Sequence, residues 1–325
     1  MIDALHIEAN ANVALVKYWG KADEAANLPA TGSVSISLDA LKTTTIMKQG
    51  AGPNDEIWLN GESVGTGVDR IQSFIDRVRT MYVGIGPVHV ISTNSFPTGA
   101  GLASSASGFA ALAIGINRLC GIGLEPADVS RLARLGSGSA ARSVYGGFVA
   151  ISADGDGAAV PIDVDMTHWP LTVLIAVTDT AAKSVGSTQA MQRTADTSPY
   201  YAEWVQQHPA DMIEAHRSIA EADFDGLATV SIRSCMKMHA AIMAARPPII
   251  YWNPGTMAVV NAVEGWREAG RRVFYTIDAG PQVKVICHQD DVAVCNRELA
   301  QLPGVRNVIE SGIGGEPRVH WSYSR

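Results

Sequence analysis

The feature that most constrains this chain is a glycine- and serine-rich stretch that stands directly before an apolar run. Residues 97–108 read PTGAGLASSASG, and residues 109–116 read FAALAIGI. Glycine lets the backbone turn at positive φ and approach a ligand closely, and the free N–H groups at a helix start can hold phosphate oxygens. The stretch therefore predicts a phosphate-binding loop that opens a helix over residues 105–119.

This loop differs from the common P-loop. The pattern G-x-x-x-x-G-K-[ST] occurs nowhere in the chain, so the lysine that it would supply has to come from another segment. A flexible glycine-serine linker is the alternative interpretation. The apolar run that follows argues against a linker.

The composition predicts a folded chain of about two domains and excludes a basic, nucleic-acid-binding protein. Hydrophobic residues make up 47% and charged residues 18% of the 325 residues, as is ordinary for a globular protein. The net charge is −7, so the positive field that attracts nucleic acid is missing. A bound phosphate group would have to meet a local cluster of cations.

The cysteines and the chain start bear on localisation. Four widely spaced cysteines form no C-x-x-C pair, which predicts reduced core thiols and neither a zinc site nor a disulfide framework. No residue is assigned as a metal ligand. Because a leader-like start and a membrane-spanning apolar run are both missing, we expect a soluble, cytoplasmic protein without membrane association.

Periodicity predicts a mixture of strands and helices, with a domain boundary at Trp169 and Pro170. Strands are predicted over residues 5–16, 33–38, 43–48, 56–60, 88–92, 171–177, 273–277, 283–288 and 305–309. Helices are predicted over residues 68–82, 105–119, 126–135, 200–221, 224–244, 256–269 and 292–302. Residues 183–191 lack strong periodicity and are predicted to form a mobile loop.

Four dispersed segments resemble one protein family. The loop pattern P-x-x-x-G-L-x-S-S-A-S is similar to the nucleotide loop of the GHMP superfamily, the galacto-, homoserine, mevalonate and phosphomevalonate kinases. Residues 92–98 lead into it as in diphosphomevalonate decarboxylases. Residues 10–21 (NANVALVKYWGK), 136–143 (GSGSAARS) and 275–281 (YTIDAGP) are similar to the same family. Gln282 departs from it, because asparagine is usual there, which leaves the fine positioning of the site in doubt.

The resemblance implies an α+β fold with two domains, the GHMP kinase fold, and an active site in the cleft between them. Residues 1–169 would form a nucleotide-binding domain of the ribosomal protein S5 domain 2-like type. Residues 170–325 would form a ferredoxin-like C-terminal domain. ATP and Mg²⁺ are the implied cofactors, and a homodimer is the implied assembly.

The implied reaction is ATP-dependent decarboxylation of mevalonate 5-diphosphate to isopentenyl diphosphate, with release of ADP, phosphate and CO₂, in the mevalonate pathway of isoprenoid biosynthesis. A tertiary hydroxyl leaves poorly, so phosphorylation of that hydroxyl would precede the loss of CO₂. Three alternatives stay open. They are a mevalonate 5-phosphate decarboxylase giving isopentenyl phosphate, a GHMP small-molecule kinase that does not decarboxylate, and a noncatalytic anion-binding protein.

The resemblance also assigns the residues of the site. The catalytic residues would be Asp278, Lys17, Arg142 and Ser104. The substrate's diphosphate and carboxylate would be held by Tyr18, Trp19, Gly20, Lys21, Arg70, Ser137, Gly138, Ser139, Ala140, Ala141, Arg142, Ser187 and Thr188. The nucleotide would be held by Asn94, Pro97, Gly99, Ala100, Gly101, Leu102, Ser104 and Ser105.

The residue types fit these roles, although simpler interpretations exist. A guanidinium matches phosphate and carboxylate oxygens with two parallel hydrogen bonds, which suits Arg142. In isolation Lys17, Lys21 and Arg70 would be ordinary surface cations. Asp278 would accept or orient the hydroxyl proton, but a nearby Lys17 would lower its pKa and weaken it as a base. The sequence leaves open whether Asp278 or Lys17 dominates proton transfer.

Overall fold

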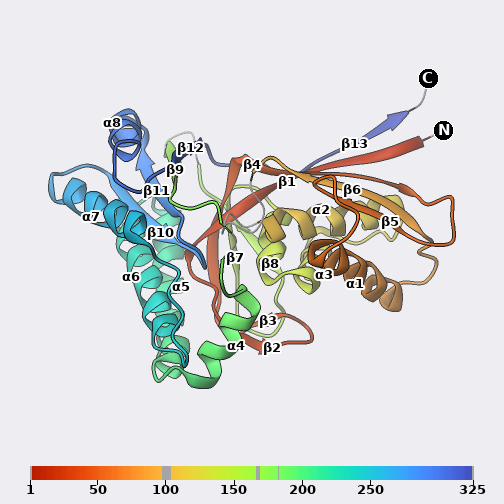
Figure 1. Cartoon of the computed structure of the whole chain (residues 1–325), viewed down its shortest axis with the longest axis horizontal. Helices are drawn as coiled ribbons and strands as arrows, with labels where there is room; N and C mark the ends of the chain where they lie inside the picture. The colour runs from red at the N-terminus through yellow and green to blue at the C-terminus, as the bar shows by residue number, and fades with distance from the viewer. Residues whose placement is uncertain (1, 97–103, 166–168, 182, 324–325) are drawn as a thin grey trace.

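The chain forms two β-sheets at opposite ends of an elongated molecule (Figure 1). This computed structural model describes residues 2–96, 104–165, 169–181 and 183–323. Both chain ends lie at the end that holds the first sheet. No helix in these described ranges is long and apolar enough to cross a bilayer.

The first sheet is built on two long antiparallel strands, and its strand order is β13-β1-β4-β6-β5, with β7 attached to β4 and β8 attached to β7. Its strands are β1 (Ile2–Val16), β4 (Ser33–Gln49), β5 (Glu56–Leu59), β6 (Val88–Asn94), β7 (Phe148–Ile151), β8 (Ala159–Ile162) and β13 (Arg318–Tyr323). A separate hairpin joins β2 (Lys21–Asp23) to β3 (Leu28–Pro29).

The prediction of two strands at residues 33–38 and 43–48 was wrong, because both belong to β4. The pairing register with β1 jumps from Lys42 opposite Asn10 to Leu38 opposite Ala11. Such a bulge absorbs extra residues without ending the strand. The interruption of the alternation in the sequence marks this bulge.

Helices cover one face of the first sheet (Figure 1). They are α1 (Thr66–Met81), α2 (Ser104–Leu119), α3 (Pro126–Gly136) and the short 3₁₀ helix η1 (Gly138–Val144). The face of α1 predicted from its period is buried, as its residues Ile71, Phe74, Ile75 and Val78 show. These side chains join the apolar strand residues and α2 in one core.

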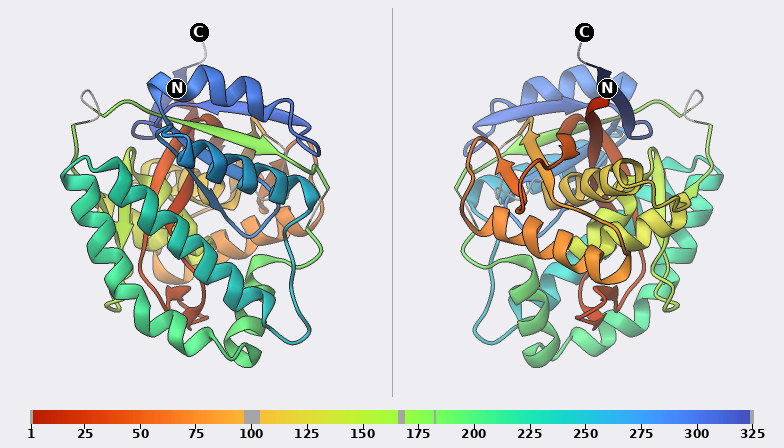
Figure 2. Two further views of the ribbon diagram at one scale, coloured as in Figure 1. Left: turned by 90° about the vertical axis from the view of Figure 1, so that its left-hand side faces the viewer. Right: turned by 90° about the vertical axis from the view of Figure 1, so that its right-hand side faces the viewer.

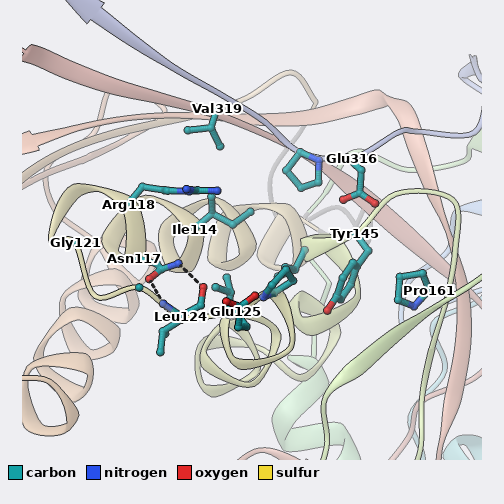
Figure 3. A pocket seen from close by; sticks show the side chains of 15 residues that line it. Ile114, Asn117, Arg118, Gly121, Leu124, Glu125, Tyr145, Pro161, Glu316 and Val319 are labelled. Atoms are coloured by element: carbon teal, nitrogen blue, oxygen red, sulfur yellow. Dashed lines mark hydrogen bonds between the residues drawn. The ribbon is translucent and has the colours of Figure 1, made fainter.

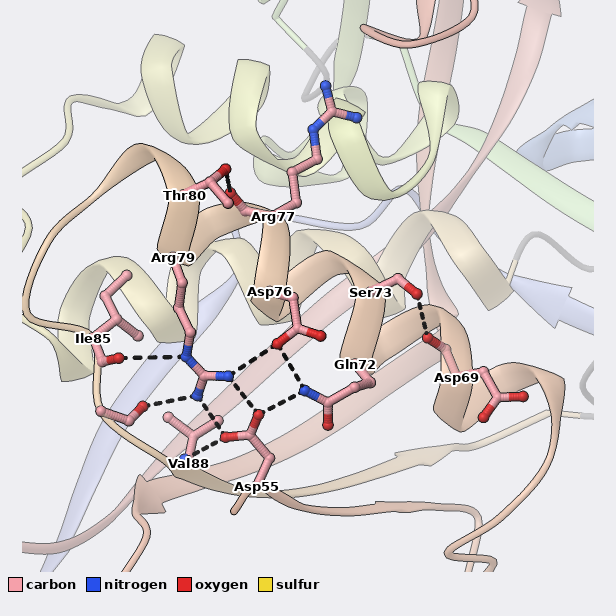
Figure 4. Close-up of polar contacts among 11 residues, drawn as sticks. Asp55, Asp69, Gln72, Ser73, Asp76, Arg77, Arg79, Thr80, Ile85 and Val88 are labelled. Carbon is pink, nitrogen blue, oxygen red and sulfur yellow. Dashed lines mark hydrogen bonds and ion pairs between the residues drawn. The ribbon is translucent and has the colours of Figure 1, made fainter. Parts of the chain in front are cut away.

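A buried carboxylate ties α1 to the sheet (Figure 4). Asp55, whose side chain is 2% exposed, accepts two hydrogen bonds of 2.6 Å from Arg79. It also accepts from Gln72 at 2.8 Å and from the N–H group of Val88 at 2.8 Å. Burial alone would raise the pKa of Asp55, but these hydrogen bonds outweigh it and lower the pKa below its usual value.

Asp55→Asn is expected to lower the free energy of unfolding by about 1–3 kcal/mol, the cost of removing a hydrogen-bonded charge from a buried site. Because the pKa of Asp55 is lowered by folding, its contribution is present above the unfolded pKa of about 3.9 and is lost as the pH falls further. Urea unfolding at pH 7 and at acidic pH measures both effects. Asp76→Asn is the control, because Asp76 is exposed and also pairs with Arg79. This substitution should lower the free energy of unfolding by under about 1 kcal/mol.

The second sheet is fully antiparallel, with the strand order β10-β11-β9-β12. Its strands are β9 (Leu171–Val177), β10 (Val273–Ile277), β11 (Val283–His288) and β12 (Asn307–Ser311). Its helices are α4 (Ser187–Thr197), α5 (Tyr201–Ala220), α6 (Phe224–Met243), α7 (Pro254–Glu268) and α8 (Gln289–Leu299). The left panel of Figure 2 shows several of these helices crossing in front of the sheet.

A shared core joins the two halves. Side chains of β1 and β4 pack with those of β9, β10, β11, α5 and α6 in one apolar cluster. Two hydrogen bonds hold β1 against the second half: Thr276 donates to the carbonyl of Ala14 at 3.1 Å, and the N–H of Lys17 donates to Ser234 at 3.0 Å. The end of β1 therefore lies beside the end of β10.

The α+β fold with two sheets agrees with the predicted fold class. The boundary at residues 169 and 170, between a domain of residues 1–169 and one of residues 170–325, stays a prediction. The last strand, β13, pairs with β1 and returns the chain to the first sheet. The predicted loop over residues 183–191 was wrong in its second half, because α4 begins at Ser187.

Candidate active site

Three charged side chains from both halves of the chain meet where β1 and β10 end. Lys17 directly follows β1, Asp278 directly follows β10, and Lys284 lies on β11. The ammonium of Lys17 lies 2.5 Å from Oδ1 of Asp278, and that of Lys284 lies 3.4 Å from Oδ2. Both lysines are almost fully buried, while the Asp278 side chain is 25% exposed. The carboxylate is thus reachable and is held from both oxygens.

The two lysines determine the charge state of this carboxylate. Burial alone would raise the pKa of Asp278, but Lys17 and Lys284 outweigh burial and hold that pKa well below its usual range. Burial lowers the pKa of Lys284, and Asp278 partly opposes this effect. Asp278 is therefore ionised at neutral pH.

Arg142, on η1, is a buried cation whose partners here are neutral. Its guanidinium donates to Ser33 at 2.6 Å and to the side-chain oxygen of Asn12 at 3.1 and 3.3 Å. It forms no ion pair with a carboxylate of the described residues, although the charge of Asp278 acts on it from further away. Burial lowers the pKa of Arg142 to about 10, so it stays charged at neutral pH. A buried cation with neutral partners attracts an anionic ligand.

Two tyrosine hydroxyls lie against glycines beside this centre. A Cβ atom on Gly138 would lie 2.6 Å from the hydroxyl of Tyr18, and one on Gly20 would lie 2.0 Å from the hydroxyl of Tyr201. Gly20 also has φ of 100°, which glycine adopts readily. The Tyr18 hydroxyl is buried without a hydrogen-bond partner among the described residues, and burial raises its pKa to about 12. A ligand oxygen would satisfy it.

The predicted cradle at residues 136–143 contributes hydroxyls and backbone rather than every side chain. Ser137 and Ser139 lie 3.2 Å apart through their hydroxyls, and the carbonyl of Ser139 accepts from Asn12 at 3.0 Å. Ala140 and Ala141 are fully buried in the core. These two alanines can therefore contribute only through the backbone, and they fix the 3₁₀ turn that presents Arg142.

Trp19 is placed in the same way. Its side chain is 3% exposed and packs with Trp204, Met191 and Met238 in an aromatic cluster of the second half. Its carbonyl accepts a hydrogen bond from Trp204 at 3.1 Å. The side chain of Trp19 thus anchors the turn after β1, and its buried indole N–H has no hydrogen-bond partner among the described residues.

The start of α2 carries the described part of the predicted nucleotide loop. Ser104 and Ser105 begin the helix and are half-buried, and Arg70 donates to Ser105 at 3.2 Å and to the carbonyl of Gly136 at 3.2 Å. The first N–H groups of a helix lack intrahelical partners and bind anions. The predicted residues Pro97, Gly99, Ala100, Gly101 and Leu102 lie outside the described residues.

Asn94 is linked to the start of α2 through Thr43. Thr43 donates to the side-chain oxygen of Asn94 at 2.6 Å, and its hydroxyl also lies 2.6 Å from that of Ser107. Ser107 is fully buried on α2. The contacts show Asn94 connecting β6 to the helix through Thr43, which is a positioning contact.

Further cations surround the rim of the site. Lys21 begins β2 and is half-exposed, and Lys183 donates to Ser187 at 2.7 Å and to the carbonyl of Ala279 at 3.2 Å. Burial lowers the pKa of Lys183, while Asp278 opposes that change. Ser187 therefore joins the site through Lys183, and Thr188 is exposed at the start of α4.

Sequence reasoning missed Lys284, Lys183, Asn12 and Ser33. Asn12 and Ser33 lie on β1 and β4, and they became visible only when the pairing of these strands brought them to Arg142. A lysine within an apolar strand was the one available signal for Lys284. Lys183 stands in a segment without periodicity, so nothing in the pattern distinguished it from a surface cation.

Gln282 does not face the reacting groups. It is fully buried, accepts from the N–H of Thr178 at 2.7 Å and donates to the carbonyl of Asp179. These bonds join the turn after β10 to the end of β9. The departure from asparagine at this position therefore affects how the Asp278 turn is fixed, and its longer side chain spans the two segments.

Two cavities on the described part of the chain are lined by none of Lys17, Arg142, Asp278 and Lys284. One of about 890 Å³ lies between α2, α3 and β13 and is lined by Arg118, Glu125, Tyr145 and Glu316 among others (Figure 3). Two carboxylates and one guanidinium suit a polyanion poorly. A second, of about 640 Å³, borders α4 and includes Thr188. Within the described ranges, no group of three or more His, Cys, Asp or Glu side chains could hold a metal ion.

Comparison with known proteins follows the same division into halves. Residues 9–160 match the diphosphomevalonate decarboxylase-like N-terminal domain, and residues 173–319 match the mevalonate 5-diphosphate decarboxylase C-terminal domain. The chain is 38% identical to the human diphosphomevalonate decarboxylase, with 89% of this chain and 78% of the human protein covered.

Solved structures resemble the whole chain. Mevalonate diphosphate decarboxylase from Staphylococcus aureus superposes with a TM-score of 0.91 at 35% identity, covering 98% of both chains. A structure described as MDDEF in complex with MVAPP, AMPPCP and magnesium gives a TM-score of 0.90 at 33% identity, covering 98% of this chain and 99% of that one. The chain belongs to the diphosphomevalonate decarboxylase family of the GHMP superfamily.

Proposed function

We propose that this chain converts mevalonate 5-diphosphate and ATP to isopentenyl diphosphate, ADP, phosphate and CO₂, with the centre around Asp278 as its active site. The observation that carries this proposal is the buried, charged Arg142 with neutral partners near an Asp278 that two lysines hold. Three basic side chains thus face a single carboxylate. A substrate with a carboxylate and a diphosphate supplies the missing negative charge.

The residues fit ATP and Mg²⁺, which are the proposed cofactors. The start of α2 offers N–H groups that lack intrahelical partners and the hydroxyls of Ser104 and Ser105, with Arg70 beside them. The related structure with AMPPCP and magnesium supports this assignment. When bound, ATP with Mg²⁺ supplies the phosphoryl group that makes the tertiary hydroxyl of the substrate a leaving group. Pro97, Gly99, Ala100, Gly101 and Leu102, which lie outside the described residues, are proposed to complete the nucleotide site.

The chain's own groups divide the remaining work. Asp278 orients the substrate hydroxyl and accepts its proton, and Lys17 lies close enough to stabilise the negative oxygen that develops. Arg142, Tyr18 and the Ser137 to Ser139 turn hold anionic groups of the substrate, assisted by Lys21, Ser187 and Thr188 at the rim. Such catalysis depends mainly on positioning and charge neutralisation.

The test is an assay that measures ADP and CO₂ together. With mevalonate 5-diphosphate, ATP and Mg²⁺, equal amounts of ADP and CO₂ are expected. ADP without CO₂ would identify a kinase, and turnover of mevalonate 5-phosphate alone would identify the monophosphate enzyme. Nucleotide binding without ADP formation would leave a noncatalytic protein.

Ser104→Ala is expected to lower kcat roughly 10²-fold, because a donor positioned for the transition state is lost, while the KM values change little. Steady-state kinetics of ADP release measure the effect. Ser73→Ala on α1 is the control, since the Ser73 hydroxyl bonds only its own helix among the described residues. An unchanged kcat for Ser104→Ala would remove this serine from the proposed site.

The assembly and location proposed for the protein are a homodimer in the cytoplasm. The dimer rests on the resemblance to the family, and light scattering of the purified protein tests it. The cytoplasmic location is supported by Cys120, Cys235, Cys287 and Cys295, which are all free thiols, as reducing compartments favour. Fractionation of expressing cells tests the location.

A further inference from the structure

We propose that Lys284 is a positioning residue that keeps the Asp278 carboxylate fixed and compensated while Lys17 turns its charge to the reacting oxygen. This inference rests on the proposed function, and it resolves how one lysine can serve both the base and the developing alkoxide.

The geometry divides the two lysines between the two carboxylate oxygens. Lys17 donates to Oδ1 of Asp278, and Lys284 lies 3.4 Å from Oδ2. The two cations come from different elements, since Lys17 follows β1 and Lys284 lies within β11. The contact of Lys17 with Asp278 can therefore change while the contact of Lys284 with Asp278 stays in place.

The position of Lys284 is fixed more firmly than that of an ordinary lysine. It pairs with Thr276 of β10 and Ile175 of β9 in the middle of the sheet. Its side chain is 3% exposed, and its ammonium also lies 3.5 Å from the carbonyl of Gln282. Such a lysine cannot exchange its partner for water, so it serves Asp278 as a permanent partner.

Charge arithmetic explains why a second lysine is needed. With Lys17 alone, any shift of its ammonium toward the substrate would leave a largely buried carboxylate without a countercharge, which is strongly unfavourable. Lys284 removes this penalty. Lys17 can then stabilise the alkoxide during proton transfer while Asp278 stays ionised and oriented.

Among the groups that face Lys284, Asp278 sets the acidic limb of the pH profile. They are Asp278 after β10, Lys17 after β1, Lys183 before α4, and Cys235 and His239 on α6. Burial lowers the pKa of His239 to about 3 and raises the pKa of Cys235. Both stay neutral through mildly acidic pH, so an acidic limb that moves upward reports the carboxylate.

The decisive variant is Lys284→Met, which keeps the length of the side chain and removes the charge. We expect kcat with mevalonate 5-diphosphate to fall roughly 10- to 100-fold, the range for groups that orient a functional residue, with the KM for ATP unchanged. The acidic limb of kcat/KM should move up by at least about one pH unit, because one of two cations that lower the pKa of Asp278 is gone.

Lys237→Met is the matched control. Asp211 on α5 is likewise buried and held by two cations of α6, with Lys237 at 2.6 Å and Arg233 at 2.9 Å. Removing Lys237 should lower the melting temperature without changing kcat or the pH profile. A loss caused only by destabilisation would therefore appear in both variants.

The outcomes separate this inference from the function beneath it. If wild type releases no CO₂ from mevalonate 5-diphosphate, the proposed function fails. If wild type is active and Lys284→Met keeps both its kcat and its acidic limb, Lys284 has no positioning role. Lys284→Gln, which keeps a neutral donor, is measured in the same way should the methionine variant not fold.

Discussion

Asp278→Asn is expected to reduce ADP formation and CO₂ release together by roughly 10²–10⁴-fold, the usual cost of removing a general base. Asparagine keeps the size of the side chain but cannot accept the proton. The change also leaves Lys17 and Lys284 as two buried cations with no carboxylate between them. Rapid-quench measurement of ADP and trapped CO₂ follows both products in one experiment.

The controls for this variant address binding and fold. ATP affinity should change little, because the start of α2 is a separate element from the turn after β10. Asp290→Asn, at an exposed carboxylate on α8, should behave as wild type. If Asp278→Asn formed ADP at the normal rate but released no CO₂, the carboxylate would act in the second step rather than the first.

The sequence predicted the essential contact of the site. It placed Asp278 at the end of a strand beside a glycine turn and put Lys17 close enough to pair with it, across 261 residues of chain. The 2.5 Å contact confirms that pairing. It could be predicted because both residues end buried strands, and the motifs that contain them resemble one family. Their roles in catalysis stay predictions.

The sequence could not place Lys284. Residues 283–288 read as an apolar strand, and one lysine in such a strand is normally a solvent-facing residue of an edge. Only the topology shows that β11 lies between β10 and β9 with both faces covered. The partner of Lys284 follows from strand order, which no local pattern contains.

The family motifs predicted which residues lie near the site better than they predicted whether the side chain or the backbone of each residue is available to a ligand. Trp19, Ala140 and Ala141 stand inside motifs, yet the fold buries their side chains. Residues within one motif can serve packing or ligand contact, so the letters of the motif alone cannot separate the two. The start of α4 was missed for another reason, because Ser187 begins a helix of only 11 residues, with few apolar positions from which a period can be recognised.

Arg142→Gln is expected to lower kcat/KM, with a loss of about 2–5 kcal/mol of transition-state stabilisation. This is the cost of truncating one partner of a desolvated charge pair. The guanidinium donates three hydrogen bonds to Ser33 and Asn12, which are neutral. Its charge can therefore attract the anionic groups of the substrate. Glutamine can keep one of those hydrogen bonds but brings no charge. Steady-state kinetics with mevalonate 5-diphosphate measure the loss.

Stability distinguishes this loss from a damaged fold. A buried cation with neutral partners is costly before substrate arrives, so Arg142→Gln should keep or exceed the wild-type melting temperature while its kcat/KM collapses. Arg134, 6% exposed on α3 and bonded to the carbonyl of Ala26, is the matched control. Arg134→Gln should change kcat/KM far less.

Wild-type kinetics for Arg142→Gln would mean that the anionic groups bind elsewhere, whereas a lower melting temperature with normal kinetics would make Arg142 a structural residue. The opposite movement of activity and stability is the result that a substrate-binding arginine, held charged in a dry site, has to give.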